Sequence, residues 1–83
     1  PNPLIGAAEI PFSLEAPGPV HLTIFNVLGQ PVRTLIDGEK AAGRDAVVWD
    51  GRDDVGDPVS SGVYLYRMVT ATSHATRRLL LLR

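Results

Sequence analysis

The segment from Asp50 to Asp57 contains the residue types of this sequence that are best suited to binding a cation. It reads DGRDDVGD, so four carboxylates lie within eight residues. Hard ions such as calcium prefer several carboxylate and carbonyl oxygens on a flexible loop. The spacing does not match an EF-hand, which needs regularly spaced Asp or Asn ligands and a distal Glu. Asp and Gly also build consecutive turns, and we therefore expect a loop that folds without metal or cofactor.

Histidine and serine are the other residues that could do chemistry, as acid–base or nucleophilic catalysts. His21 falls on the polar side of a predicted strand and His74 in a predicted turn, and the serines are scattered along the chain. No serine has the local sequence of a nucleophile elbow, and none lies beside a base. The two histidines lack the spacing of zinc ligands. We expect no catalytic residue, no metal site and no small-molecule substrate, and we predict that the protein is not an enzyme.

The length and charge of the chain restrict what these residues can belong to. Eighty-three residues are enough for one domain, and 45% hydrophobic with 20% charged residues indicates a folded one. The net charge of −1 provides no field that would attract nucleic acid. The longest apolar run, Leu79–Leu82, is much shorter than a membrane helix. We therefore expect a single domain over residues 1–83 that does not bind nucleic acid.

Alternation of apolar and polar residues predicts β-strands throughout, with no convincing helical period. A glycine after the second strand predicts a tight hairpin with Gly29 at positive φ, and Gly56 and Gly62 are also expected to serve backbone turns. Regularly spaced short strands separated by turn formers favour an all-β sandwich or barrel. The predicted strands are residues 9–14, 20–27, 30–36, 45–50, 62–71 and 76–82.

Trp49 is predicted to be the centre of the core, because it lies on the apolar side of its strand. The tyrosines could instead form a stacking platform for sugars or single strands, but their alternation favours core packing. The residues predicted to pack with Trp49 are Leu22, Ile24, Tyr64, Tyr66 and Met68.

The last two strands are apolar on both faces, which a small isolated sandwich does not need. They are expected to pair as an antiparallel hairpin and to present an apolar strip outside the core. We expect a neighbouring domain, another copy of the chain or a membrane-associated machine to cover this strip. Its predicted members are Val63, Leu65, Val69, Leu80 and Leu82, flanked by Arg77, Arg78 and Arg83.

Several stretches together resemble a known family. They are PNP at residues 1–3, FSL at 12–14, VHLTIFNVLGQPV at 20–32, AG at 42–43, WDGRD at 49–53, VSSGVY at 59–64 and RRLLLLR at 77–83. This combination resembles the type A C-terminal sorting domains of type IX secretion cargo. Through the middle of the chain it is also similar to the immunoglobulin-like domain of flagellar hook-capping proteins. The resemblance implies an immunoglobulin-like antiparallel β-sandwich of about seven strands.

The resemblance also implies a function. Our main expectation is a non-catalytic sorting or anchoring module of a secreted bacterial surface protein, recognised by an outer-membrane secretion machine. One alternative is a self-assembling extracellular subunit, and another is the flagellar hook-cap domain. All three place the protein outside the bacterial cell or on its outer surface, and all three imply protein partners.

Overall fold

The computed structural model describes residues 2–83, and the side chains of residues 5–83. It consists of β-strands joined by turns, six of them seven to ten residues long and one of three residues. The strands are β1 (Asn2–Leu4), β2 (Ala7–Leu14), β3 (Gly18–Phe25), β4 (Pro31–Lys40), β5 (Gly43–Trp49), β6 (Gly62–Thr70) and β7 (His74–Leu81). Among the described residues, no helix has the length and hydropathy needed to cross a bilayer.

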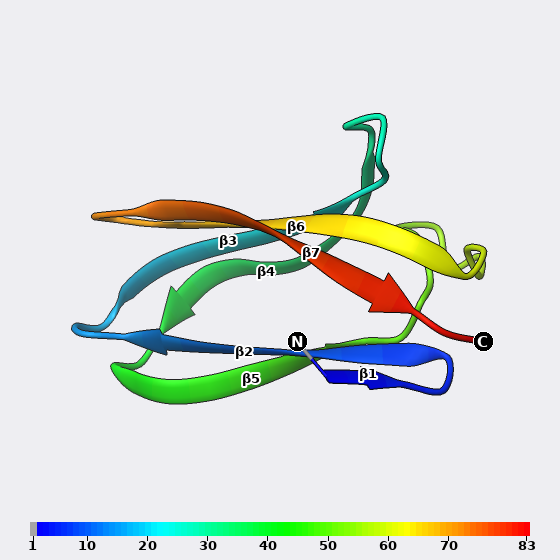
Figure 1. Ribbon diagram of the computed structural model, residues 1–83. Helices are drawn as coiled ribbons and strands as arrows, with labels where there is room; N and C mark the ends of the chain where they lie inside the picture. The colour runs from blue at the N-terminus through cyan, green and yellow to red at the C-terminus, as the bar shows by residue number, and fades with distance from the viewer. Residues whose placement is uncertain (1) are drawn as a thin grey trace.

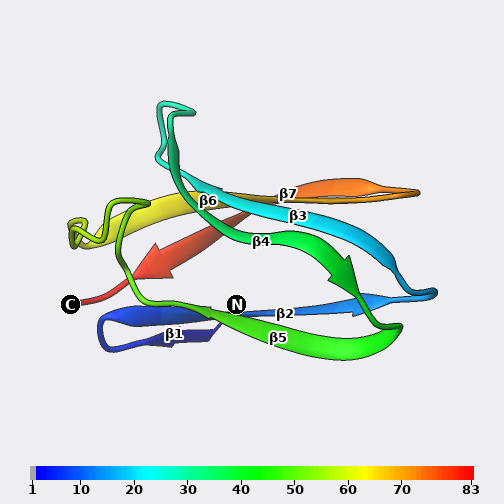
Figure 2. The same cartoon turned by 180° about the vertical axis from the view of Figure 1, so that it is seen from behind.

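The strands form two antiparallel sheets that face each other (Figure 1). One sheet has the order β1-β2-β5 and the other β4-β3-β6-β7. The view from behind shows the same two layers, with the chain passing between them at the β2–β3, β4–β5 and β5–β6 connections (Figure 2). The predicted all-β sandwich is therefore confirmed. The predicted pairing of the last two strands is also observed, from Gly62 opposite Leu81 to Val69 opposite His74.

The core lies between the two sheets and is centred on Trp49, which is fully buried. The Tyr64 ring packs edge-on against the indole, with 5.0 Å between ring centroids and 75° between ring planes. This is one of the geometries that aromatic pairs prefer. The other predicted core residues Leu22, Ile24 and Tyr66 are buried with it, while Met68 is only partly buried and packs against the cluster. Leu79 and Leu81 complete the core from β7.

Several stretches differ from the sequence prediction, and β7 begins at His74, which was predicted to lie in a turn. The residues of β1 were not predicted as a strand, yet they pair with β2. Residues 37–40 were predicted to be part of a loop, yet they extend β4 and pair with the start of β3, from Gly18 opposite Lys40 to His21 opposite Asp37. Their composition is that of a turn, but backbone pairing at a solvent-exposed sheet edge makes little demand on side chains.

The hairpin between β3 and β4 rises from the sheet on the side away from the other layer (Figures 1 and 2). The side-chain oxygen of Asn26 accepts the N–H groups of Leu28 and Gln30, both at 3.0 Å. Gly29 has φ +82° in this turn, as predicted. Val27 and Leu28 are exposed at its tip. The turn is therefore held by its own hydrogen bonds and exposes two aliphatic side chains.

The end of β7 connects the two layers. After its last pair with β6, the chain turns toward the first sheet, where Leu82 forms a parallel bridge with Ile5. The N–H of Gly6 donates to the Leu82 carbonyl. One side of the sandwich is closed in this way, between β1 and β7 (Figure 1).

Candidate functional site

The loop from Asp50 to Asp57 lies at one end of the sandwich, and its carboxylates bind backbone N–H groups. One Asp53 oxygen accepts the N–H groups of Val55 and Asp57, at 3.1 and 2.9 Å. One Asp50 oxygen accepts the N–H of Arg52 at 3.1 Å. These are Asx-type turns, in which a carboxylate takes the place of a backbone acceptor. Gly56 has φ +91° here, as predicted.

The same loop is bonded to the body of the domain. The indole N–H of Trp49 donates to the Arg52 carbonyl at 2.9 Å, so the central core residue also fixes the loop. Arg33 of β4 forms a salt bridge with Asp50 at 3.2 Å. The backbone N–H of Thr34 donates to an Asp54 oxygen at 3.0 Å. The loop thus has a defined conformation built from its own acidic side chains.

The carboxylates of the loop, which by composition could bind a cation, point to separate places. Within residues 5–83, no three His, Asp or Glu side chains group closely enough to hold a metal ion. Asp50, Asp53 and Asp54 each direct an oxygen to backbone N–H groups, at separate points of the loop. The loop has the chemistry of consecutive turns.

Gly51 is the most constrained residue of the loop. It is buried, with φ +72°, and a side-chain carbon at this position would lie 2.9 Å from the Gly6 carbonyl oxygen and 3.2 Å from Leu81. The Arg83 side chain packs against Gly51, and its guanidinium donates to the Gly51 carbonyl. It also donates to the Val59 carbonyl, at 2.6 Å. This constraint on Gly51 was not predicted from the sequence. The signal in the sequence was the WDGRD stretch, in which the glycine comes two residues after the core tryptophan.

The second candidate surface is the outer face of the four-stranded sheet. Since directly paired residues of antiparallel strands share a face, the register defines its rows. Val63 lies opposite Leu80, and Leu65 lies between Phe25 and Arg78. Val63 and Leu80 are each 43% exposed. Two members of the predicted apolar strip, Val63 and Leu80, are therefore exposed on this face.

Three predicted members of the strip lie elsewhere. Arg83 turns its side chain into the loop at Gly51 and Val59, away from the strip. Arg77 lies opposite the buried Tyr66 and so belongs to the inner face of the sheet, on the edge strand β7. Leu82 is 41% exposed but lies beyond the β6 pairing, at its bridge to Ile5. The register was not available from the sequence, so these side chains could not be assigned to a face.

Two other residues complete the description of this face. Val69 shares it but is partly buried, in a row between His21 and His74. Phe25 was not predicted as part of the strip, and its place opposite Leu65 depends on the β3–β6 register. Successive residues of a strand point to opposite faces of the sheet, so Phe25 faces away from the buried Ile24 and lies on the outer face. This alternation is the feature of the sequence that could have identified it.

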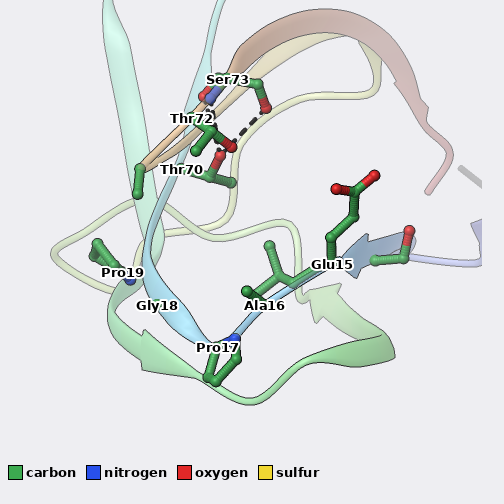
Figure 3. Close-up of a pocket in the computed structure, with 11 residues that line it drawn as sticks. Glu15, Ala16, Pro17, Gly18, Pro19, Thr70, Thr72 and Ser73 are labelled. Atoms are coloured by element: carbon green, nitrogen blue, oxygen red, sulfur yellow. Dashed lines mark hydrogen bonds between the residues drawn. The ribbon is translucent and has the colours of Figure 1, made fainter.

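A hollow of about 450 Å³ lies between the β2–β3 and β6–β7 turns (Figure 3). Glu15 is the one ionisable residue in its lining, which is otherwise Pro, Gly, Ala, Leu, Ser and Thr. The polar side chains of Thr70 and Ser73 bond to each other across the turn, at 3.2 Å between their oxygens. The hollow contains no pair of groups suited to acid–base or nucleophilic catalysis.

The geometry therefore defines a class of protein: a small immunoglobulin-like antiparallel β-sandwich. A family model described as the FlgD Ig-like domain matches residues 5–74. The chain belongs to this family. Strands β2 to β6 lie wholly within that range, and β7 begins at its last residue.

Solved structures agree with the family. The chain is similar to FlgD from P. aeruginosa, with a TM-score of 0.71 and 24% identity over 89% of this chain and 58% of that one. It is also similar to FlgD from Xanthomonas campestris, described with regard to the hook capping essential for flagellar assembly. There the TM-score is 0.71 and the identity 28%, over 90% of this chain and 55% of that one. The chain thus spans a little over half the length of these proteins. No curated protein sequence matches it.

These findings correct the main functional expectation. The type IX sorting module expected from the sequence is wrong, because the family that matches over most of the chain is the FlgD Ig-like domain. The flagellar hook-cap domain, given as an alternative, agrees with the family and with both structures. Both resemblances rested on the same turn-rich motifs of this sequence, which constrain the fold more than the function.

Proposed function

We propose that this chain is the Ig-like domain of a flagellar hook-capping protein, and that it acts by binding protein without catalysing a reaction. The observation that carries the proposal is the family match over residues 5–74. The FlgD structures support it, since their fold extends over about nine-tenths of this chain.

The arrangement of the polar side chains supports a binding role. The acidic residues Asp50, Asp53 and Asp54 accept backbone N–H groups, and Thr70 and Ser73 bond to each other. Groups engaged in this way build rigid turns, and a rigid scaffold with exposed apolar side chains suits protein recognition. In this role the domain works outside the cell, in contact with other flagellar subunits or with further copies of itself.

The proposal is tested by locating the protein in the bacterium that encodes it. Antibodies against the folded domain, applied with gold labels to isolated hooks and whole cells, should mark the tips of growing hooks in electron micrographs. Deletion of the coding region for residues 5–82 should remove both the label and the hooks, and restoration of the wild-type region should return both. Label that is absent from hooks, with hooks intact after the deletion, would contradict the proposal.

A further inference from the structure

The outer face of the four-stranded sheet carries two positive charges close together. Arg78 lies opposite Leu65, and Arg67 is two residues further along β6. Such diagonal neighbours are about 7–8 Å apart. Both side chains are exposed, and in the part of the chain that the structure describes neither forms a salt bridge. Together with Phe25, Val63, Leu65 and Leu80, they form what we call the cationic strip.

The chemistry that complements this strip is an aliphatic side chain flanked by carboxylates. The loop at the end of the sandwich has that chemistry, since Val55 is 82% exposed and follows Asp54. Asp57 lies two residues beyond, and its carboxylate accepts no hydrogen bond from residues 5–83. The hydrogen bonds that the Asp53 carboxylate accepts already order the loop, so that docking it costs little conformational entropy.

The two surfaces cannot meet within one molecule. The strip covers the outer face of β6 and β7, whereas the loop lies beyond the end of the sheet where β6 begins (Figures 1 and 2). A symmetric contact of strip with strip would place Arg67 and Arg78 of one copy against those of the other, which like-charge repulsion disfavours. The complementary arrangement is therefore head to tail.

We infer that the loop around Val55 of one copy docks on the cationic strip of a second copy. Val55 packs on Leu65 and Leu80, and Asp54 and Asp57 approach Arg67 and Arg78. Contacts of this heterologous kind continue from copy to copy and produce rings or filaments. The contact would serve assembly in the proposed hook-capping role, but it is a property of the chain in solution and does not depend on that role.

The test measures the mass of the chain by sedimentation equilibrium at low and high salt. The wild-type chain, 8.9 kDa as a monomer, should show an average mass that rises with concentration at about 50 mM salt and falls back at about 500 mM, where charges are screened. Arg78→Glu and Asp57→Arg should each weaken association about fivefold, because each turns an attraction into a repulsion. Combining both changes in one chain restores complementary charges and should restore the association.

Matched controls change charge away from the contact. Arg44→Glu on β5 and Glu15→Arg in the β2–β3 turn are exposed positions that should leave association unchanged. Urea midpoints show whether each variant is folded, and Arg67→Glu replaces Arg78→Glu if the latter is not. The inference is overturned if the wild-type chain stays monomeric, if Asp57→Arg associates like wild type, or if the double variant is no better than the single ones. None of these results would affect the hook labelling that tests the proposed function.

Discussion

Replacing Gly51 by alanine should destabilise this domain more than the same replacement at any exposed turn glycine. Gly51 has φ +72°, where an alanine costs about 1–2 kcal/mol. Its new methyl group would also lie 2.9 Å from the Gly6 carbonyl oxygen, which is backbone and cannot turn aside. Forcing an extra carbon into such a packed position costs about 1–3 kcal/mol. We therefore expect a loss of about 3 kcal/mol in the free energy of unfolding.

Gly29→Ala is the matched control. Gly29 has a similar φ of +82°, but nothing lies within 4 Å of the position that its side-chain carbon would take. Only the backbone strain remains, so the loss should be about 1 kcal/mol. Urea unfolding followed by the fluorescence of the buried Trp49 measures both variants under the same conditions.

The nearest atom to the added methyl group is a guanidinium nitrogen of Arg83, at 2.7 Å, and a flexible side chain can move away. A double-mutant cycle with Arg83→Ala separates the two causes. If the Gly6 backbone is the obstacle, Gly51→Ala remains about 2 kcal/mol worse than Gly29→Ala in the Arg83→Ala background. Equal losses for the two glycine variants, with Arg83 present or absent, would refute the packing argument.

Three further substitutions test other parts of the structure. Trp49→Ala removes a fully buried side chain and its bond to the Arg52 carbonyl, and should cost about 3–5 kcal/mol; a wild-type urea midpoint would show that the core is placed wrongly. Asp53→Ala should cost about 1–2 kcal/mol because two N–H groups lose their acceptor, while Asp57→Ala should have almost no effect on unfolding. Asn26→Ala should speed amide hydrogen exchange in the β3–β4 turn, and unchanged exchange rates would contradict the role of its side-chain oxygen.

Much of the fold could be predicted because the alternation of apolar and polar residues along a strand indicates which of its faces is buried. Leu22 and Ile24 alternate with the polar residues His21 and Thr23, so the buried side of this strand could be predicted from a period of two. The hairpin at Gly29 follows from local turn chemistry in the same way.

What could not be predicted depends on contacts between distant residues. The strand at Asn2–Leu4 contains a proline and is held by its pairing with β2, not by its own propensity. Gly51 is constrained by Gly6 and Leu81, which are far from it in the chain. Arg83 was predicted to be an exposed charge beside the final strand, yet its guanidinium donates to the carbonyls of Gly51 and Val59, more than twenty residues earlier.

The acidic loop shows the limit of composition as a guide to a site. Four carboxylates in eight residues suggest a cation site, but the structure shows three of them bonded to backbone N–H groups. One-letter sequence does not record where a carboxylate points. For the cationic strip, the apolar residues of β6 and β7 were predicted from the sequence. Phe25 could be assigned to the strip only from the register between β3 and β6.

The parallel bridge between Ile5 and Leu82 has a mechanical consequence. Because the two segments run in the same direction, tension applied to the two ends of the chain pulls them past each other along their length. The Gly6–Leu82 hydrogen bond and the contacts of Arg83 with Val59 and Ser61 are then loaded in shear at the same time. They are not broken one after another. Resistance to stretching from the two ends should therefore depend on these contacts breaking together, and the hairpin tips carry no load until they do.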